Sequence, residues 1–241
     1  MLDVDGTLVI NRQDGMPSEK VEKAINKAAK IIKIGLATSR PLSDISHIIK
    51  RLNLITPCII TGGAQIYDPV SKKFILEHII NKKDIEKIAE ITRNLKTLVL
   101  VQDGQKAVPF NGKYSPQKPI QIWIHGLKPD FAEKLLDDFS SVPAISVQKT
   151  PSWKIGMIDF VITSAVGTKQ HGIEEIAKIL KISTHEIIGI GDGYNDFPLL
   201  MACGLKIAMG NANEELKKIA DFIAPSVEED GVATAIEKFI L

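Results

Sequence analysis

The sequence has few cysteines, no excess of either charge and no long apolar run. Its two cysteines, Cys58 and Cys203, cannot make a disulfide framework, and we expect both to be small packed side chains. The 30 basic and 29 acidic residues give a net charge of +1, which argues against a nucleic-acid partner. No apolar run approaches the ~18 residues of a membrane span, and no secretory signal pattern opens the chain. These absences predict a protein of the reducing cytoplasm, without a membrane or nucleic-acid partner.

What is present is an ordinary globular composition. Of the 241 residues, 44% are hydrophobic and 24% are charged, well outside the range of disordered chains. The length suffices for one large domain or two small ones, with ample material for a core. The sequence contains no repeat and no low-complexity segment.

Both ends of the chain alternate short apolar runs with helical patterns. The first runs are MLDV, IGLATS and CIITGG, separated by helical spacing over residues 18–33, where Ser18 is a plausible N-cap, and 41–53. Towards the C-terminus the runs are EIIGIGDG, LKIAMG and DFIAPS, and the helical patterns are 169–182, 197–204, 213–220 and 231–241. Strands that alternate with helices form right-handed βαβ units, so the two ends predict one doubly wound parallel α/β sheet.

The middle of the chain has several strands for each helix. After a helical pattern at 81–94, two β-rich runs flank Asp103-Gly104, a dipeptide that favours a hairpin. QIWIHG, AISVQK and KIGMIDFVIT indicate further strands, and residues 130–141 indicate a helix. We therefore expect an antiparallel α+β insert at 80–164, between the core segments 1–79 and 165–241.

The N-terminal segment places two carboxylates, Asp3 and Asp5, one residue apart and directly after the first apolar residues. Like charges this close repel, so a cation or a reaction must compensate them. Only Met1 and Leu2 precede the first aspartate, and a buried central strand of four residues would be unusually short. Either the sheet tolerates this, or the sequence starts inside the natural chain.

Polar residues follow four of the apolar runs, where strands of one sheet would end. They are Asp3, Asp5, Gly6 and Thr7; Thr38, Ser39 and Arg40; Gly62 and Gly63; and Asp192, Asn195 and Asp196. Ligands of open parallel sheets bind beyond the carboxyl ends of the strands. Hydroxyls, backbone N–H groups and a cation suit a phosphate, and clustered carboxylates suit Mg²⁺.

Each of these groups also has a simpler structural interpretation. Acids beside glycine are common in turns, and Thr38 with Ser39 could cap a helix that begins near Pro41. Asp192 and Asp196 could be acids at a helix N-terminus, where the dipole favours them. Neither acidic segment has the glycine and glutamate spacing of an EF-hand. The joint occurrence of the groups at strand ends favours a phosphate and metal site.

The motifs resemble those of the haloacid-dehalogenase superfamily, specifically its Cof-type phosphatases with a class IIB cap. D-x-D-G-T-L stands at 3–8, the strand that ends in Thr or Ser looks like Thr38, and the lysine that opens a helix looks like Lys169. G-D-x-x-N-D stands at 191–196, and the segment after it is also similar to the Cof-type tail. The resemblance covers both core segments closely and the insert only in size and rough pattern. It implies a Rossmann-like core with an inserted α+β cap that sets substrate specificity.

The resemblance also implies the chemistry and the residues that perform it. The expected mechanism forms an aspartyl phosphate, with Asp3 as the nucleophile and Asp5 as the general acid and base. Mg²⁺ would be held by the carboxylates of Asp3 and Asp192 and by the main-chain carbonyl of Asp5. Asp196 is the last residue of the metal set, where it would position Lys169 or the metal-bound waters. Thr38 and Lys169 are the further catalytic residues. The expected phosphate and substrate contacts are Gly6, through its N–H, with Thr38, Ser39, Arg40, Lys169 and Asn195.

The predicted function is an Mg²⁺-dependent phosphatase of a small phosphorylated metabolite, either a sugar phosphate or a phosphorylated short acid. A phosphomutase that returns the phosphoryl group to a sugar and a non-catalytic sensor of phosphorylated metabolites are the alternatives. Specificity is expected to lie in the insert, where Lys106, Asn111 and His125 are candidates, although a surface loop is the simpler interpretation of each. One departure from the family is Thr61-Gly62-Gly63-Ala64, which stands where Asn-Gly-Ala is common.

Overall fold

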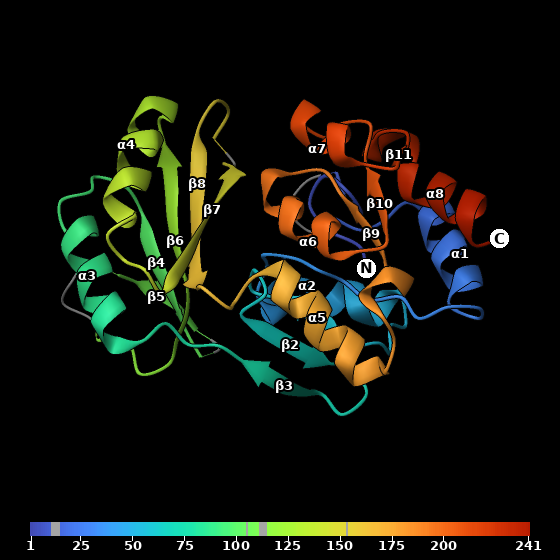
Figure 1. Cartoon of the computed structure of the whole chain (residues 1–241), viewed down its shortest axis with the longest axis horizontal. Helices are drawn as coiled ribbons and strands as arrows, with labels where there is room; N and C mark the ends of the chain where they lie inside the picture. The colour runs from blue at the N-terminus through green and yellow to red at the C-terminus, as the bar shows by residue number, and fades with distance from the viewer. Residues whose placement is uncertain (11–14, 105, 111–114, 153) are drawn as a thin grey trace.

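The computed structural model describes residues 1–10, 15–104, 106–110, 115–152 and 154–241, and Asn111 and Trp153 lie outside them. Figure 1 shows two lobes side by side. We call residues 1–79 and 165–241 the core lobe and residues 80–164 the cap lobe, and these boundaries stay a proposal. No helix in the described ranges is long and apolar enough to cross a membrane.

The core lobe is built on a parallel sheet. Its strands β9 (Ile188–Gly191), β10 (Leu205–Ala208) and β11 (Phe222–Ile223) pair in the order β11-β10-β9. Its helices are α1 (Glu19–Ala28), α2 (Leu42–Arg51), α5 (Lys169–Leu180), α6 (Phe197–Ala202), α7 (Glu214–Ile219) and α8 (Gly231–Phe239), with short 3₁₀ turns at Thr184–Glu186, Tyr194–Asp196 and Val227–Glu229. The predicted helical patterns of the core are thus confirmed, and Ser18 caps α1 by accepting the N–H of Val21.

Two segments extend this sheet by single bridges rather than as full strands. Leu2 bridges Ile190 on one side and Leu36 on the other, both in parallel, and Ala37 bridges Ile59. The N-terminal segment therefore occupies the middle of the sheet, although it pairs through one residue on each side. The chain turns at Asp5-Gly6, directly after Val4, so the pairing ends there on its carboxyl side.

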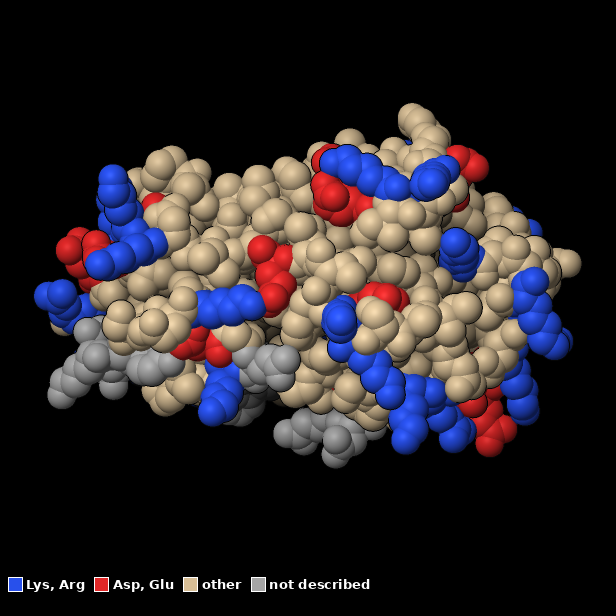
Figure 2. Space-filling view, turned by 90° about the horizontal axis from the view of Figure 1, so that it is seen from below, with Lys and Arg blue, Asp and Glu red and all other residues tan. Residues whose placement is uncertain are grey.

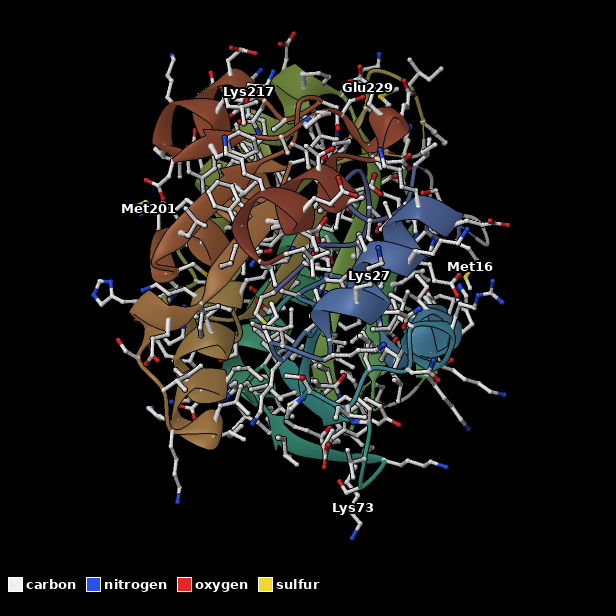
Figure 3. All side chains as sticks on the ribbon, turned by 90° about the vertical axis from the view of Figure 1, so that its right-hand side faces the viewer. Met16, Lys27, Lys73, Met201, Lys217 and Glu229 are labelled. Carbon is white, nitrogen blue, oxygen red and sulfur yellow. The ribbon has the colours of Figure 1, made fainter. Side chains whose placement is uncertain are left out.

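Helices cover both faces of the core sheet. Side chains alternate along each strand, so apolar residues lie on both faces and each face needs a helical layer to bury them. Leu36 and Ile207 point into a cluster with α1, α2 and α8, whereas Ala37 and Ala208 point into a cluster with α5, α6 and α7. Figure 3 looks onto the end of the core lobe where α1 and α8 lie side by side. The result is the predicted doubly wound α/β architecture.

The edge of the core sheet carries a hairpin that the sequence analysis did not predict. Strand β1 (Cys58–Ile60) pairs antiparallel with β2 (Gln65–Asp68), which pairs with β3 (Lys73–Glu77). The carboxylate of Asp68 accepts the N–H groups of Val70 and Ser71 and so fixes the turn. Both cysteines are buried free thiols, and burial raises the pKa of Cys58 to about 12 and that of Cys203 to about 11.

The cap lobe is an antiparallel α+β layer, as predicted. Its strands pair in the order β5-β4-β6-β8-β7, and a hairpin joins β4 to β5 at Asp103-Gly104. The strands are β4 (Val99–Asp103), β5 (Lys106–Pro109), β6 (Pro119–Leu127), β7 (Ile145–Pro151) and β8 (Ile158–Ser164), and the helices are α3 (Lys82–Thr92) and α4 (Pro129–Phe139). Figure 1 shows α3 and α4 on the side of the sheet away from the core lobe.

The two faces of the cap sheet differ in polarity. Val101, Ile122 and Ile162 pack with the two helices in an apolar cluster. The opposite face carries Gln102, Gln121, Trp123, His125 and Thr150, and it borders the core lobe. Charges elsewhere are mixed: on the face drawn in Figure 2, the described basic and acidic side chains lie in groups over both lobes.

A close backbone contact fixes where α5 leaves the cap and enters the core. Gly63 has a φ of +108°, and a Cβ there would lie 2.1 Å from the carbonyl carbon of Thr168 and 2.7 Å from the nitrogen of Lys169. Thr168 caps α5 by accepting the N–H of His171. The position of Lys169, the first residue of the helix, therefore depends on a site that accepts only glycine.

Gly63→Ala is expected to lower the free energy of unfolding by about 2–5 kcal/mol, because it adds backbone strain and a clash with backbone atoms. Gly156→Ala is the matched control, since Gly156 has a φ of +76° with no atom within 4 Å of the added Cβ. The control should lose only about 1 kcal/mol. Urea denaturation measures both, and equal losses would contradict the contact with Thr168.

Candidate active site

A buried lysine joins two carboxylates at the carboxyl edge of the core sheet. The Nζ of Lys169 lies 2.6 Å from Oδ1 of Asp3 and 2.6 Å from Oδ1 of Asp196. The three side chains are at most 4% exposed. They come from the end of the first sheet segment, the start of α5 and the turn after β9, so the sheet edge brings together residues that are remote in sequence.

Burial and charge act in opposite directions on this lysine. Burial alone would lower the pKa of Lys169, but the carboxylates of Asp196 and Asp3 outweigh it and raise the pKa above its usual value. Burial raises the pKa of Asp3 well above its usual value, and the Asp196 carboxylate adds to the increase. Lys169 therefore remains an ammonium ion, and Asp3 depends on neighbouring cations to stay ionised.

The acids of this region have the donor set of a metal site. Asp3, Asp192 and Asp196 each offer one oxygen, and the three oxygens lie within 4.8 Å of one another. Three carboxylates against one ammonium leave two uncompensated negative charges. Burial, with the Asp196 carboxylate, raises the pKa of Asp192 to about 7. A hard divalent cation with oxygen ligands fits both the donors and the charge.

Asp196 has the geometry of a positioning residue. Its Oδ1 accepts Lys169, and its Oδ2 accepts the N–H groups of Asp192 at 3.0 Å and Gly193 at 2.9 Å. Both of its oxygens are thus already used, which makes Asp3 and Asp192 the better candidates for direct ligands. Asp196 thus holds Lys169 and the loop that carries Asp192, as expected for a residue beside the lysine, and its place in the metal set stays a prediction.

The second carboxylate of the N-terminal pair has a different partner. Arg40 donates from Nε to Oδ2 of Asp5 at 2.9 Å and from Nη2 to Oδ1 at 2.6 Å, a two-point contact that fixes the carboxylate plane. Its Nη1 donates to the carbonyl of Asp44. Arg40, expected at the substrate, therefore holds Asp5 in this conformation.

Thr38 and Ser39 end the neighbouring sheet segment beside Arg40. The hydroxyl of Thr38 accepts the N–H of Arg40 at 3.1 Å, which leaves its own hydrogen to donate. Ser39 is 7% exposed, and its hydroxyl has no hydrogen-bond partner among the described residues. Both residues line the cleft between the lobes.

Gly6 has a different role from the expected one. Its N–H donates to the carbonyl of Val9 at 2.9 Å, so it does not face a phosphate in this conformation. Glycine is required because φ is +79° and a Cβ would lie 2.3 Å from Oδ2 of Asp192. Thr7 donates to Oδ1 of Asp192 at 2.8 Å, and Asn211 donates to the carbonyl of Gly6. Sequence reasoning missed these last two contacts.

A cleft of about 930 Å³ opens between the lobes above these groups. Asn195 lines it on the core side, and His125 and Trp123 line it on the cap side, their rings stacked at 5.5 Å. His125 Nδ1 lies 2.7 Å from Oδ2 of Asp159, a partner that no sequence motif indicated. Lys106 is exposed and is not among the described residues that line the cleft.

Comparison with known proteins agrees with this geometry. A family model described as haloacid dehalogenase-like hydrolase matches residues 1–125 and 127–236. A Bacillus subtilis 5-amino-6-(5-phospho-D-ribitylamino)uracil phosphatase, YcsE, is 24% identical over 100% of this chain and 94% of its own length. A phosphoglycolate phosphatase of Methanopyrus kandleri is 27% identical over 99% and 95%. The subclass IIB sugar phosphatase BT4131 has a similar fold, with a TM-score of 0.82, 23% identity and coverage of 98% and 96%.

The raised pKa of Asp192 predicts how a divalent cation acts on stability. The folded protein holds this proton up to about pH 7, whereas the unfolded chain releases it near pH ~3.9, so stability falls as pH rises between the two values. Mg²⁺ favours the ionised carboxylate and should raise Tm more at pH 8 than at pH 5. Thermal unfolding with Mg²⁺ and with chelator measures the difference.

Asp192→Asn should remove most of that Mg²⁺ effect at pH 8. Asp138→Asn is the control, because Asp138 is an exposed aspartate of α4. The metal assignment is wrong if Mg²⁺ stabilises the Asp192 variant as strongly as the wild-type protein.

Proposed function

Because the chain belongs to the haloacid dehalogenase-like hydrolases and is a phosphatase of that superfamily, we propose that it is an Mg²⁺-dependent phosphomonoesterase of a small phosphorylated metabolite. The observation that carries the proposal is the separation of the two neighbouring acids. Asp3 is buried against Lys169, and Asp5 is held by Arg40 at the cleft. Asp3 thus lies beside a fixed cation, and Asp5 lies at the cleft, where a leaving group would enter.

In the first step, a carboxylate oxygen of Asp3 attacks the phosphorus and the bond to the leaving oxygen breaks. The product is an aspartyl phosphate, which splits one difficult reaction into two easier ones. Asp5, once it has left Arg40 and taken up a proton from solvent, gives that proton to the leaving oxygen. The ammonium of Lys169, with the Thr38 hydroxyl, binds the phosphoryl oxygens and stabilises the charge that they carry.

In the second step, water attacks the phosphorus and Asp5 takes a proton from it. Phosphate leaves, and Asp3 regains its carboxylate. Asp3, Asp192 and the Asp5 carbonyl are the residues that would hold Mg²⁺, whose charge offsets the repulsion between carboxylate and phosphate. A cytoplasmic location is part of the proposal.

The walls of the cleft favour a neutral leaving group with several hydroxyls. Ser39 on the core side and Thr150 on the cap side are buried, line the cleft and have hydroxyls without a partner in the described ranges. An unpaired buried polar group costs about 1–3 kcal/mol, and a ligand hydroxyl can both donate to it and accept from it. Arg40 on the same wall is already paired with Asp5, while Asp44 adds a negative charge. These features support a sugar or sugar-alcohol phosphate over a phosphorylated acid.

Asp3→Asn should reduce the hydrolysis of p-nitrophenyl phosphate by on the order of 10⁴-fold or more, because the nucleophile is gone. Asp5→Asn should lower the rate of hydrolysis less for this activated ester than for an alkyl phosphate, because the poor leaving group of an alkyl phosphate needs the acid. Released inorganic phosphate is the measurement, and an isomerised sugar phosphate as the main product would indicate a mutase instead. Equal losses of Asp5→Asn on both esters would contradict its role as the acid.

A panel of phosphorylated metabolites tests the leaving group. We expect kcat/KM to be about ten-fold or more higher for sugar or sugar-alcohol phosphates than for phosphoglycolate. Thr150→Val keeps the shape of the side chain and removes its hydroxyl, so it should lower kcat/KM by up to about ten-fold on the best polyol phosphate. Its rate on p-nitrophenyl phosphate should not change. A panel led by phosphoglycolate would refute the polyol assignment.

A further inference from the structure

Gln121 is a fully buried side chain of the cap lobe that reaches the core lobe. It lies in β6 on the polar face of the cap sheet and is 0% exposed. Its Nε2 donates to the main-chain carbonyl of Ser39 at 3.2 Å, across 82 residues of sequence. Its Oε1 accepts the indole N–H of Trp123 at 2.6 Å. One amide therefore links the core loop to the aromatic wall of the cleft.

The chemistry of the two partners allows only one orientation of this amide. An indole N–H can only donate, so the oxygen of Gln121 faces Trp123. A backbone carbonyl can only accept, so the NH₂ group faces Ser39. A glutamate at this position could satisfy Trp123 but, when ionised, would oppose the Ser39 carbonyl with a second acceptor.

The carbonyl that Gln121 binds is the middle one of three that are all held. The carbonyl of Thr38 accepts the N–H of Gly62 at 3.0 Å, and that of Arg40 accepts the N–H of Thr61 at 2.9 Å. Both of these donors belong to the core lobe. Gln121 is the donor from the cap, and it completes the set only while the cap lies on the core.

The contact is packed as well as bonded. Gly62 has a φ of +73°, and a Cβ there would lie 3.3 Å from Nε2 of Gln121, tight enough to require a shift. In the paired strand β8, Thr163 donates to the carbonyl of Gly167 in the linker that returns to the core. The polar face of the cap sheet thus contacts the core lobe through two neighbouring residues, Gln121 and Thr163.

We propose that Gln121 is a positioning residue that holds the cap closed and sets the Thr38–Arg40 loop at the same time. Thr38 supplies a hydroxyl to the site, and Arg40 holds Asp5, so a shift of the Ser39 carbonyl moves both. Through Trp123, the same amide sets the ring against which His125 stacks. The role of the loop in catalysis rests on the proposed function, whereas the closure of the cap does not.

An exposed cross-lobe contact is of a different kind. Lys118 in the cap lies 2.6 Å from Glu77 of β3, but its side chain is 48% exposed. Exposed ion pairs are weak and are screened by salt, whereas a buried neutral hydrogen bond is not. The effect of Gln121 should therefore persist at high ionic strength.

Gln121→Glu tests the inference through the pH dependence of activity. The groups recorded around Gln121 are uncharged, and Arg40, next to Ser39, is paired with Asp5. Burial should raise the pKa of the new carboxyl group, and its protonated form can again donate to Ser39. We expect kcat/KM on p-nitrophenyl phosphate, relative to the wild-type protein at the same pH, to fall about ten-fold at pH 8 and to recover towards pH 5. The ratio should be the same at low and high salt.

Two further variants keep the test decisive. The methionine of Gln121→Met has a similar length and no hydrogen-bond donor, so the loss of kcat/KM should be the same at every pH. This variant replaces the glutamate variant in the test if that variant does not fold. Gln148→Glu buries the same charge on the cap sheet, at a side chain with no partner among the described residues. Its activity relative to wild type should be independent of pH.

Small-angle X-ray scattering gives a readout that does not depend on catalysis. The radius of gyration of Gln121→Glu should exceed that of wild type at pH 8 and approach it at pH 5. If no phosphatase activity were found, this result would still support the closure of the cap by Gln121. A ratio that is flat with pH, with a radius of gyration equal to that of wild type, would overturn the inference.

Discussion

The ammonium of Lys169, buried between Asp3 and Asp196, is the interaction on which the site depends. Removing three ionised groups from water is costly, and their attraction repays that cost only if the geometry is good. Loss of one partner from such a set leaves an uncompensated buried charge, which costs about 3–5 kcal/mol. The elements that carry the three residues must therefore meet at one place. Three features fix their positions there: the close contact at Gly63, the Thr168 cap of α5 and the turn after β9.

The same constraint explains why two adjacent acids are tolerated. Val4 between them is fully buried, and the chain turns immediately afterwards at Gly6, whose left-handed φ brings Asp192 against it. Asp3 is directed to the lysine and Asp5 to Arg40, so each carboxylate has its own cation. The two acids are close in sequence but have different electrostatic surroundings, because one partner opens α5 and the other follows the sheet segment at Leu36 and Ala37.

Strand ends were predictable from the sequence, but the hydrogen bonds between loops were not. Short apolar runs that stop at polar residues located Asp3, Thr38 and Asp192 at one edge, because parallel strands present their carboxyl ends together. The bond from the N–H of Gly6 to Val9 was not predicted, since it depends on a turn that a motif does not describe. The contacts of Gln121 and Asp159 could not be predicted from the sequence, because the register of the sheet decides which residues a single polar side chain in a strand faces. The β2–β3 hairpin was missed as well, although Asp68-Pro69 is a turn signal.

The polar face of the cap sheet has a consequence for how firmly the lobes hold together. An apolar interface would make opening expensive, whereas Gln102, His125 and Thr150 can be hydrated when the cap moves away. We infer that closure against such a face involves a free-energy difference of the size that a few hydrogen bonds supply. In an equilibrium of that kind a single contact shifts the populations measurably. A buried glutamine that bonds the Thr38–Arg40 loop can therefore matter more here than its one hydrogen bond would in the core of either lobe.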